Sequence, residues 1–83
     1  MELERRYSEQ AARERELAEA ALEKSRGAWL YALSQECEGM RDHFIRIATQ
    51  SRFEGRNHQQ RARHFEELAA RASRTSPELE TLG

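Results

Sequence analysis

The chain has 83 residues, 35% of them charged and 37% hydrophobic, and its formal net charge at pH 7 is −1. This length allows one small domain, and domains of this size, which bury a smaller share of their surface, usually need a staple or a partner. Because Cys37 is the single cysteine, an internal disulfide is excluded as the staple. We therefore expect oligomerisation, and the lone thiol favours a reducing, cytoplasmic location.

The composition predicts an all-α fold. Good helix formers (Ala, Glu, Arg, Leu and Gln) dominate the sequence, β-branched residues are scarce, and Pro77 is the single proline. Helix is therefore sterically allowed from the start of the chain to Ser76.

Residues 1–26 form a charged N-terminal segment without an apolar run, so we expect neither a signal peptide nor a membrane span. Gly27 leaves two alternatives open for this segment. Either one long helix passes through Gly27 and ends near Phe53, at a cost of about 1 kcal/mol for the glycine, or the helix breaks there and residues 1–26 form a separate helix.

The next segment carries the clearest periodicity in the chain. Large apolar residues recur there at three- and four-residue steps, which predicts one apolar helix face packed against a core. Cys37 lies in the middle of this stripe, so we expect a buried, unreactive thiol. The predicted inner stripe is Trp29, Leu30, Leu33, Cys37, Met40, Phe44, Ile47 and Ala48.

A tight helix–helix turn is predicted at residues 54–57. Gly55 suits the left-handed position that ends a helix, and Asn57 with Gln60 resembles a capping box for the next helix. Residues 27–73 would then form an antiparallel helical hairpin, and residues 74–83 a short C-terminal tail. The second helix would bury His58, Ala62, Phe65, Leu68, Ala69 and Ala72.

The sequence contains none of the patterns that carry chemistry. The single cysteine and the three histidines have no metal-ligand spacing. Glycine-rich phosphate loops, nucleophile elbows and zinc-protease motifs are missing. We therefore expect a non-enzymatic protein with no catalytic residue, metal, cofactor or small-molecule substrate.

Protein binding has the strongest support, because several large side chains lie off the predicted inner stripe, where a neighbouring molecule would cover them. Small residues beside that stripe (Ala21, Ala28, Ala32 and Gly39) also suit the close approach of another helix. We expect self-association into a dimeric helical bundle, and the predicted residues are Leu17, Leu22, Tyr31 and Ile45.

Arginines gather around the predicted turn and the second helix, and four of them are predicted to contact a target: Arg52, Arg56, Arg61 and Arg63. The leading hypothesis is a small regulator, inhibitor or adaptor that binds a larger intracellular machine, of the kind that phages and plasmids encode. The alternative is a small nucleic-acid-binding regulator that uses the same arginines against phosphates.

Overall fold

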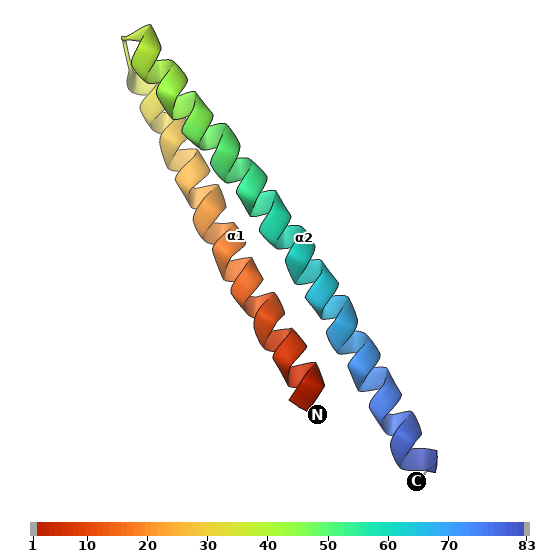
Figure 1. Cartoon of the computed structure of the whole chain (residues 1–83). Helices are drawn as coiled ribbons and strands as arrows, with labels where there is room; N and C mark the ends of the chain where they lie inside the picture. The colour runs from red at the N-terminus through yellow and green to blue at the C-terminus, as the bar shows by residue number, and fades with distance from the viewer. Residues whose placement is uncertain (1, 83) are drawn as a thin grey trace.

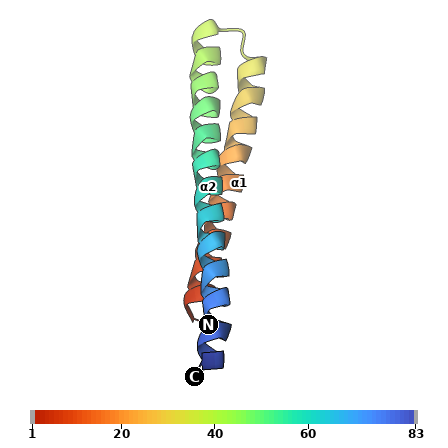
Figure 2. The same cartoon turned by 90° about the vertical axis from the view of Figure 1, so that its right-hand side faces the viewer.

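The computed structural model describes the backbone of residues 2–82 and the side chains of residues 2–74. Two α-helices make up almost all of it: α1, Glu2–Ser34, and α2, Glu38–Leu82. The helices lie side by side and antiparallel (Figure 1), and they wind around each other along a rod with extents of 69 × 12 × 11 Å (Figure 2). The predicted all-α helical hairpin is confirmed.

The predicted turn at residues 54–57 is wrong. The chain reverses at residues 35–37, and α2 runs without a break through Gly55 and Asn57. Of the two alternatives for Gly27, a continuous helix is the one found, so the described part of the N-terminal segment, residues 2–26, belongs to α1. This helix ends at Ser34 rather than near Phe53, which makes α2 the longer of the two.

Local hydrogen bonds close the turn. The Gln35 backbone N–H donates to the Ala32 carbonyl at 3.3 Å, and the Arg41 guanidinium donates to the Gln35 carbonyl at 2.9 Å. The Cys37 carbonyl accepts the Arg41 backbone N–H at 3.0 Å, so Cys37 occupies the capping position immediately before α2.

Small residues at seven-residue steps form the contact between the helices. Such a period keeps one line of side chains facing the partner helix throughout a coiled coil. All eight members of this set are buried. We call it the alanine seam: Ala11, Ala18, Ser25 and Ala32 on α1, and Ala48, Gly55, Ala62 and Ala69 on α2.

Contacts across the alanine seam explain where the chain turns. Ser25 Oγ donates a hydrogen bond of 2.7 Å to the Ala48 carbonyl, and Gly55 lies against Ala18 and Leu22. In an antiparallel pair that places Ser25 beside Ala48, the bend falls midway between them, at residues 36 and 37. Gly55 has no positive φ. Its role is to let the two helices approach closely, not to end a helix.

Most of the predicted inner stripe is also wrong, although Ala48 is buried as predicted. Leu30 and Leu33 are 69% and 79% exposed, and Cys37, Trp29 and Met40 are exposed as well. Among the described residues no large side chain is fully buried. The helices pack through small side chains because alanine permits a closer approach, and the large apolar side chains are left on the outside.

The residues three positions after the members of the alanine seam form a second line of contacts between α1 and α2. At one level Tyr7 stacks on Phe65, with ring centroids 6.3 Å apart. One heptad further on, Glu14 Oε2 lies 2.5 Å from His58 Nδ1, and their side chains are only 14% and 23% exposed. His58, predicted as an apolar-stripe residue, therefore contributes a polar contact inside the helix pair.

The predicted C-terminal tail, residues 74–83, is helical as far as Leu82 and continues α2. Gly83 and the side chains of residues 75–82 lie outside the described residues.

Candidate interaction surfaces

The turn end of the hairpin carries the densest group of exposed apolar side chains. Residues 28–34 are apolar on every side of α1 except at Ser34, although a two-helix contact can cover one side only. Across the turn Met40 adds to the group. We call this surface the apolar tip, and its members are Trp29, Leu30, Leu33 and Met40, which are 40%, 69%, 79% and 45% exposed.

The residues predicted for self-association lie on two opposite flanks of the hairpin. Arg15 of α1 pairs with Glu66 of α2, and these two mark one flank. Leu22 lies seven residues after Arg15 on the same side and packs over Gly55, so the hairpin itself uses this leucine. Ile45, 21 residues before Glu66, is on that flank too.

Leu17 and Tyr31 occupy the other flank. Leu17 follows Arg15 by two residues, which is about 200° around a helix, and Tyr31 is 14 residues beyond Leu17. They are 44% and 62% exposed, and the Tyr31 ring stacks on Phe44 with centroids 5.5 Å apart. Only part of the predicted set therefore shares one surface.

The four arginines predicted to bind a target do not form one patch. At about 100° per residue, Arg52, Arg56 and Arg63 fall within about 40° of one another on α2. Arg61 is about 180° from Arg52, on the opposite side of the helix. All four side chains are exposed.

Cys37 differs most from its prediction, because it is exposed at the turn and not buried in a core. Backbone N–H groups of Met40 and Gly39, in the first turn of α2, hydrogen-bond the sulfur and lower the pKa of the Cys37 thiol below its ordinary value of 9.0. Exposed N–H groups at a helix start stabilise an anion in this way. The exposure of Cys37 follows from its position immediately before Glu38, where α2 begins, and no helix start was predicted there from the sequence.

We expect the Cys37 thiol to be alkylated by iodoacetamide at lower pH in the folded chain than in the chain unfolded in urea, since the thiolate is the nucleophile. The pH dependence of the alkylation rate measures this pKa difference. Because the folded-state pKa is the lower one, the associated stability is complete above pH 9.0 and is lost as the pH falls through the folded-state pKa. Equal midpoints in the folded and unfolded chains would contradict the helix-start geometry.

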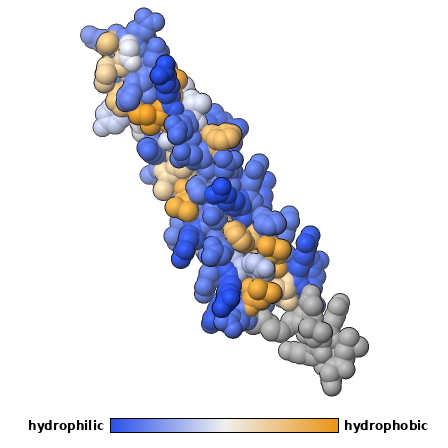
Figure 3. Space-filling view, viewed as in Figure 1, coloured by the Kyte–Doolittle hydropathy of each residue, from blue (hydrophilic) through white to orange (hydrophobic). Residues whose placement is uncertain are grey.

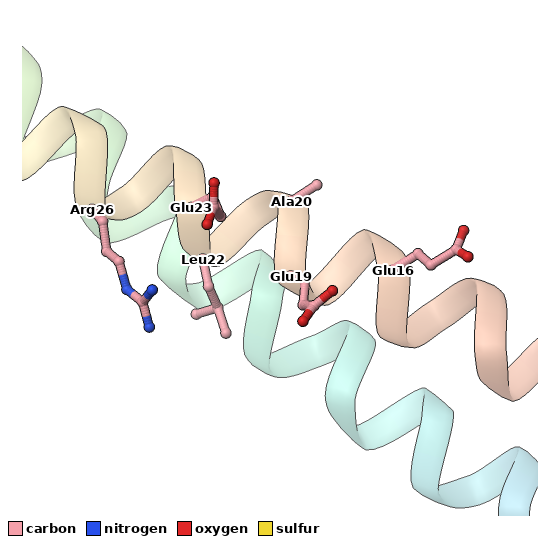
Figure 4. Close-up of a pocket in the computed structure, with 6 residues that line it drawn as sticks. All are labelled: Glu16, Glu19, Ala20, Leu22, Glu23 and Arg26. Atoms are coloured by element: carbon pink, nitrogen blue, oxygen red, sulfur yellow. The ribbon is translucent and has the colours of Figure 1, made fainter.

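A shallow depression lies on α1 near Leu22. In Figure 4 the Leu22 side chain points toward α2, whereas Glu16 and Glu23 point away from it. The depression is lined by residues of α1 alone, so it is a feature of one helix surface: Glu16, Glu19, Ala20, Leu22, Glu23 and Arg26.

Within the described residues, no three His, Cys, Asp or Glu side chains converge as they would around a metal ion. No helix in that part of the chain is long and apolar enough to cross a membrane. No protein-family model matches the sequence, and no curated protein and no solved structure is detectably similar to it.

Proposed function

We propose that the hairpin is a small non-enzymatic protein that acts by binding another protein, as a regulator, inhibitor or adaptor of a larger intracellular machine, and that the apolar tip is its contact surface. The exposure of Leu30 and Leu33, at 69% and 79%, is the observation that supports this proposal. Exposed groups of large apolar side chains on an otherwise polar protein are typical of interaction sites.

The surroundings of the apolar tip favour binding to it. Charged residues make up 35% of the chain, and Figure 3 shows apolar side chains as separate islands among hydrophilic ones. Burying one leucine or aromatic side chain contributes about 1.5–3 kcal/mol. Trp29 and Leu30 are thus able to act as the few anchoring residues that dominate an interface.

Arginines of α2 lie on the same flank as Trp29 of the apolar tip. Trp29 lies fourteen residues after Arg15 on α1, and Arg52 lies fourteen residues before Glu66 on α2. Because Arg15 and Glu66 pair across one flank, Trp29 and Arg52 share that flank. Arg56 lies one helical turn beyond Arg52. A partner surface with an apolar groove and an acidic rim would complement this arrangement.

The test compares partner capture by three forms of the full chain: the wild type, Leu30→Glu/Leu33→Glu, and a control, Ala12→Glu/Ala70→Glu, which adds the same charge at exposed positions away from the tip. We expect the wild type and the control to retain the same proteins from cell extract. The tip variant should bind the purified partner at least about 100-fold more weakly, since two buried leucines are lost.

Equal retention by the tip variant would overturn this proposal. The nucleic-acid alternative predicts a different result: retention of DNA or RNA that falls steeply with salt and is abolished by Arg52→Glu/Arg56→Glu.

A further inference from the structure

One flank of the hairpin carries large apolar side chains at six of its ten positions at seven-residue steps, and the other four are Gln10, Lys24, Glu54 and Arg61. On α1 the apolar ones are Leu3, Leu17 and Tyr31, at steps of 14 residues, and they are 54%, 44% and 62% exposed. Their counterparts on α2 are Met40, Ile47 and Leu68, which are separated by multiples of seven residues. Met40 is 45% exposed, and Ile47 and Leu68 are half-buried. We call the set the apolar flank: Leu3, Leu17, Tyr31, Met40, Ile47 and Leu68.

The two halves of the apolar flank lie on the same side of the alanine seam. Leu17 and Leu68 each follow a member of the Arg15–Glu66 ion pair by two residues. A step of two residues is about 200° around a helix, which moves both positions to the opposite flank. The seven-residue period of the remaining members then keeps them in line with these two.

We propose that the apolar flank binds a second copy of this chain, forming a four-helix bundle in which both turns lie at the same end. The seven-residue period along the whole flank is best matched by a surface that has the same period and the same winding, and a second hairpin has both. The inference goes beyond the proposed function, because Leu30 and Leu33 of the apolar tip lie off this flank and take no part in it; Met40 is the residue that belongs to both surfaces.

The size of the apolar flank suits a stable dimer. From Leu3 to Tyr31 it spans 28 residues, about 42 Å of helix, and it is two helices wide, about 18 Å for axes 8–10 Å apart. The product, about 750 Å² per copy, is close to the area of a standard protein–protein interface. The narrow seam of small side chains inside one hairpin also leaves it in need of a second layer.

Charges decide the orientation. With both turns at one end, α1 of each copy faces α2 of the other, so Tyr31 meets Met40, Leu17 meets Glu54 and Leu3 meets Leu68. Lys24 then meets Ile47 and Gln10 meets Arg61, so no like charges oppose each other at any of these levels. When the two flanks overlap fully, the reverse orientation places α2 against α2 and brings Glu54 of one copy against Glu54 of the other, which is unfavourable.

Light scattering on the full chain at about 200 μM tests the association, a concentration at which an interface with micromolar affinity is saturated. The wild type is expected at twice the chain mass of 9.7 kDa. Leu3→Glu/Leu17→Glu should weaken the dimer at least 100-fold, whereas Leu30→Glu/Leu33→Glu, the same chemistry on the same helix, should leave it intact. A monomeric wild type, or a flank variant that dimerises like the wild type, would overturn the proposal.

Cys37 reports the orientation in the unmodified sequence, without any variant that must fold. It is the single cysteine and lies exposed at the turn, so a spin label on it measures the distance between the two turns. Turns at one end predict a separation of a few helix diameters, about 15–30 Å. Turns at opposite ends of a rod 69 Å long predict a separation of most of that length, and this result would overturn the orientation. Because this measurement needs no other protein, its outcome is independent of whether the apolar tip binds a partner.

Discussion

Gly55→Leu is expected to lower the free energy of unfolding by about 3 kcal/mol, because overfilling a close contact forces the backbones apart. A Cβ at residue 55 would already lie 3.0 Å from the Cγ and Cδ2 atoms of Leu22 and 3.3 Å from the Ala18 carbonyl oxygen. The leucine side chain of α1 can turn aside, whereas the backbone oxygen cannot. A longer side chain therefore separates α1 from α2 near the middle of the alanine seam.

Thermal unfolding followed by circular dichroism, at one fixed protein concentration, measures this effect. A loss of about 3 kcal/mol should lower the melting temperature by more than about 10 °C in a chain of this length. Gly27→Ala is the matched control, since a Cβ there meets nothing within 4 Å. It should stabilise the chain by about 1 kcal/mol, the helix preference of alanine over glycine. Similar melting temperatures for the two variants would show that the helices do not approach closely at Gly55.

The helical content was predictable from the sequence, because it follows from composition and from the absence of strong breakers before Pro77. The hairpin topology was predicted correctly but from the wrong glycine, so the position of the turn was wrong. The prediction treated Gly55 as a residue needed for its backbone freedom, whereas the structure uses it for its lack of a side chain. The same residue type serves both purposes, and Gly55 can be assigned to one of them only after the facing residue is known.

The packing surface was missed for a related reason. Searching for large apolar residues leads to Trp29, Leu30 and Leu33, which lie on the outside at the apolar tip. The seven-residue recurrence of small residues is present in the sequence, and the small residues predicted to face another helix include Ala32 of this set. Alanine is also the best helix former, so its spacing alone is weak evidence. Aligning the small residues that recur every seven positions on α1 with those on α2 would have placed the turn correctly to within one heptad.

The alanine seam alone allows two registers of α2 against α1, seven residues apart, and the Glu14–His58 contact distinguishes them. The observed register places Ala11 beside Ala62 and Ser25 beside Ala48. Sliding α2 by seven residues would pair small residues equally well, because each member of the alanine seam then meets another member: Ala11 with Ala69, Ala18 with Ala62, Ser25 with Gly55, and Ala32 with Ala48.

The polar pair distinguishes the two registers. In the observed one Glu14 and His58 are 2.5 Å apart and largely covered. In the shifted one Glu14 would face Phe65 and His58 would face Ala21, and each polar group would be covered without a partner. Such a group costs about 1–3 kcal/mol, so two of them are enough to exclude the shifted register. A polar pair that selects register in this way is a known property of coiled coils.

Replacing one member of the pair should therefore lower the free energy of unfolding, and replacing the second member as well should restore it. Glu14→Leu or His58→Leu alone is expected to cost about 1–3 kcal/mol, because the remaining polar group loses its partner. Glu14→Leu/His58→Leu should recover the stability of the wild type to within about 1 kcal/mol, since well-packed apolar pairs commonly equal buried ion pairs. Urea unfolding of the four proteins completes the cycle, and additive losses would contradict the coupling.

The double variant should also lose its unique register. Spin labels at Ala12→Cys and Ala70→Cys, in a Cys37→Ser chain diluted with unlabelled protein, report the offset between α1 and α2. A slide of seven residues moves one helix along the other by about 10.5 Å and brings these two positions closer together. We expect one distance when Glu14 and His58 are present and two when both are leucine. A single, unchanged distance in the double variant would mean that the ring pair of Tyr7 and Phe65, 6.3 Å apart, is sufficient to hold the observed register.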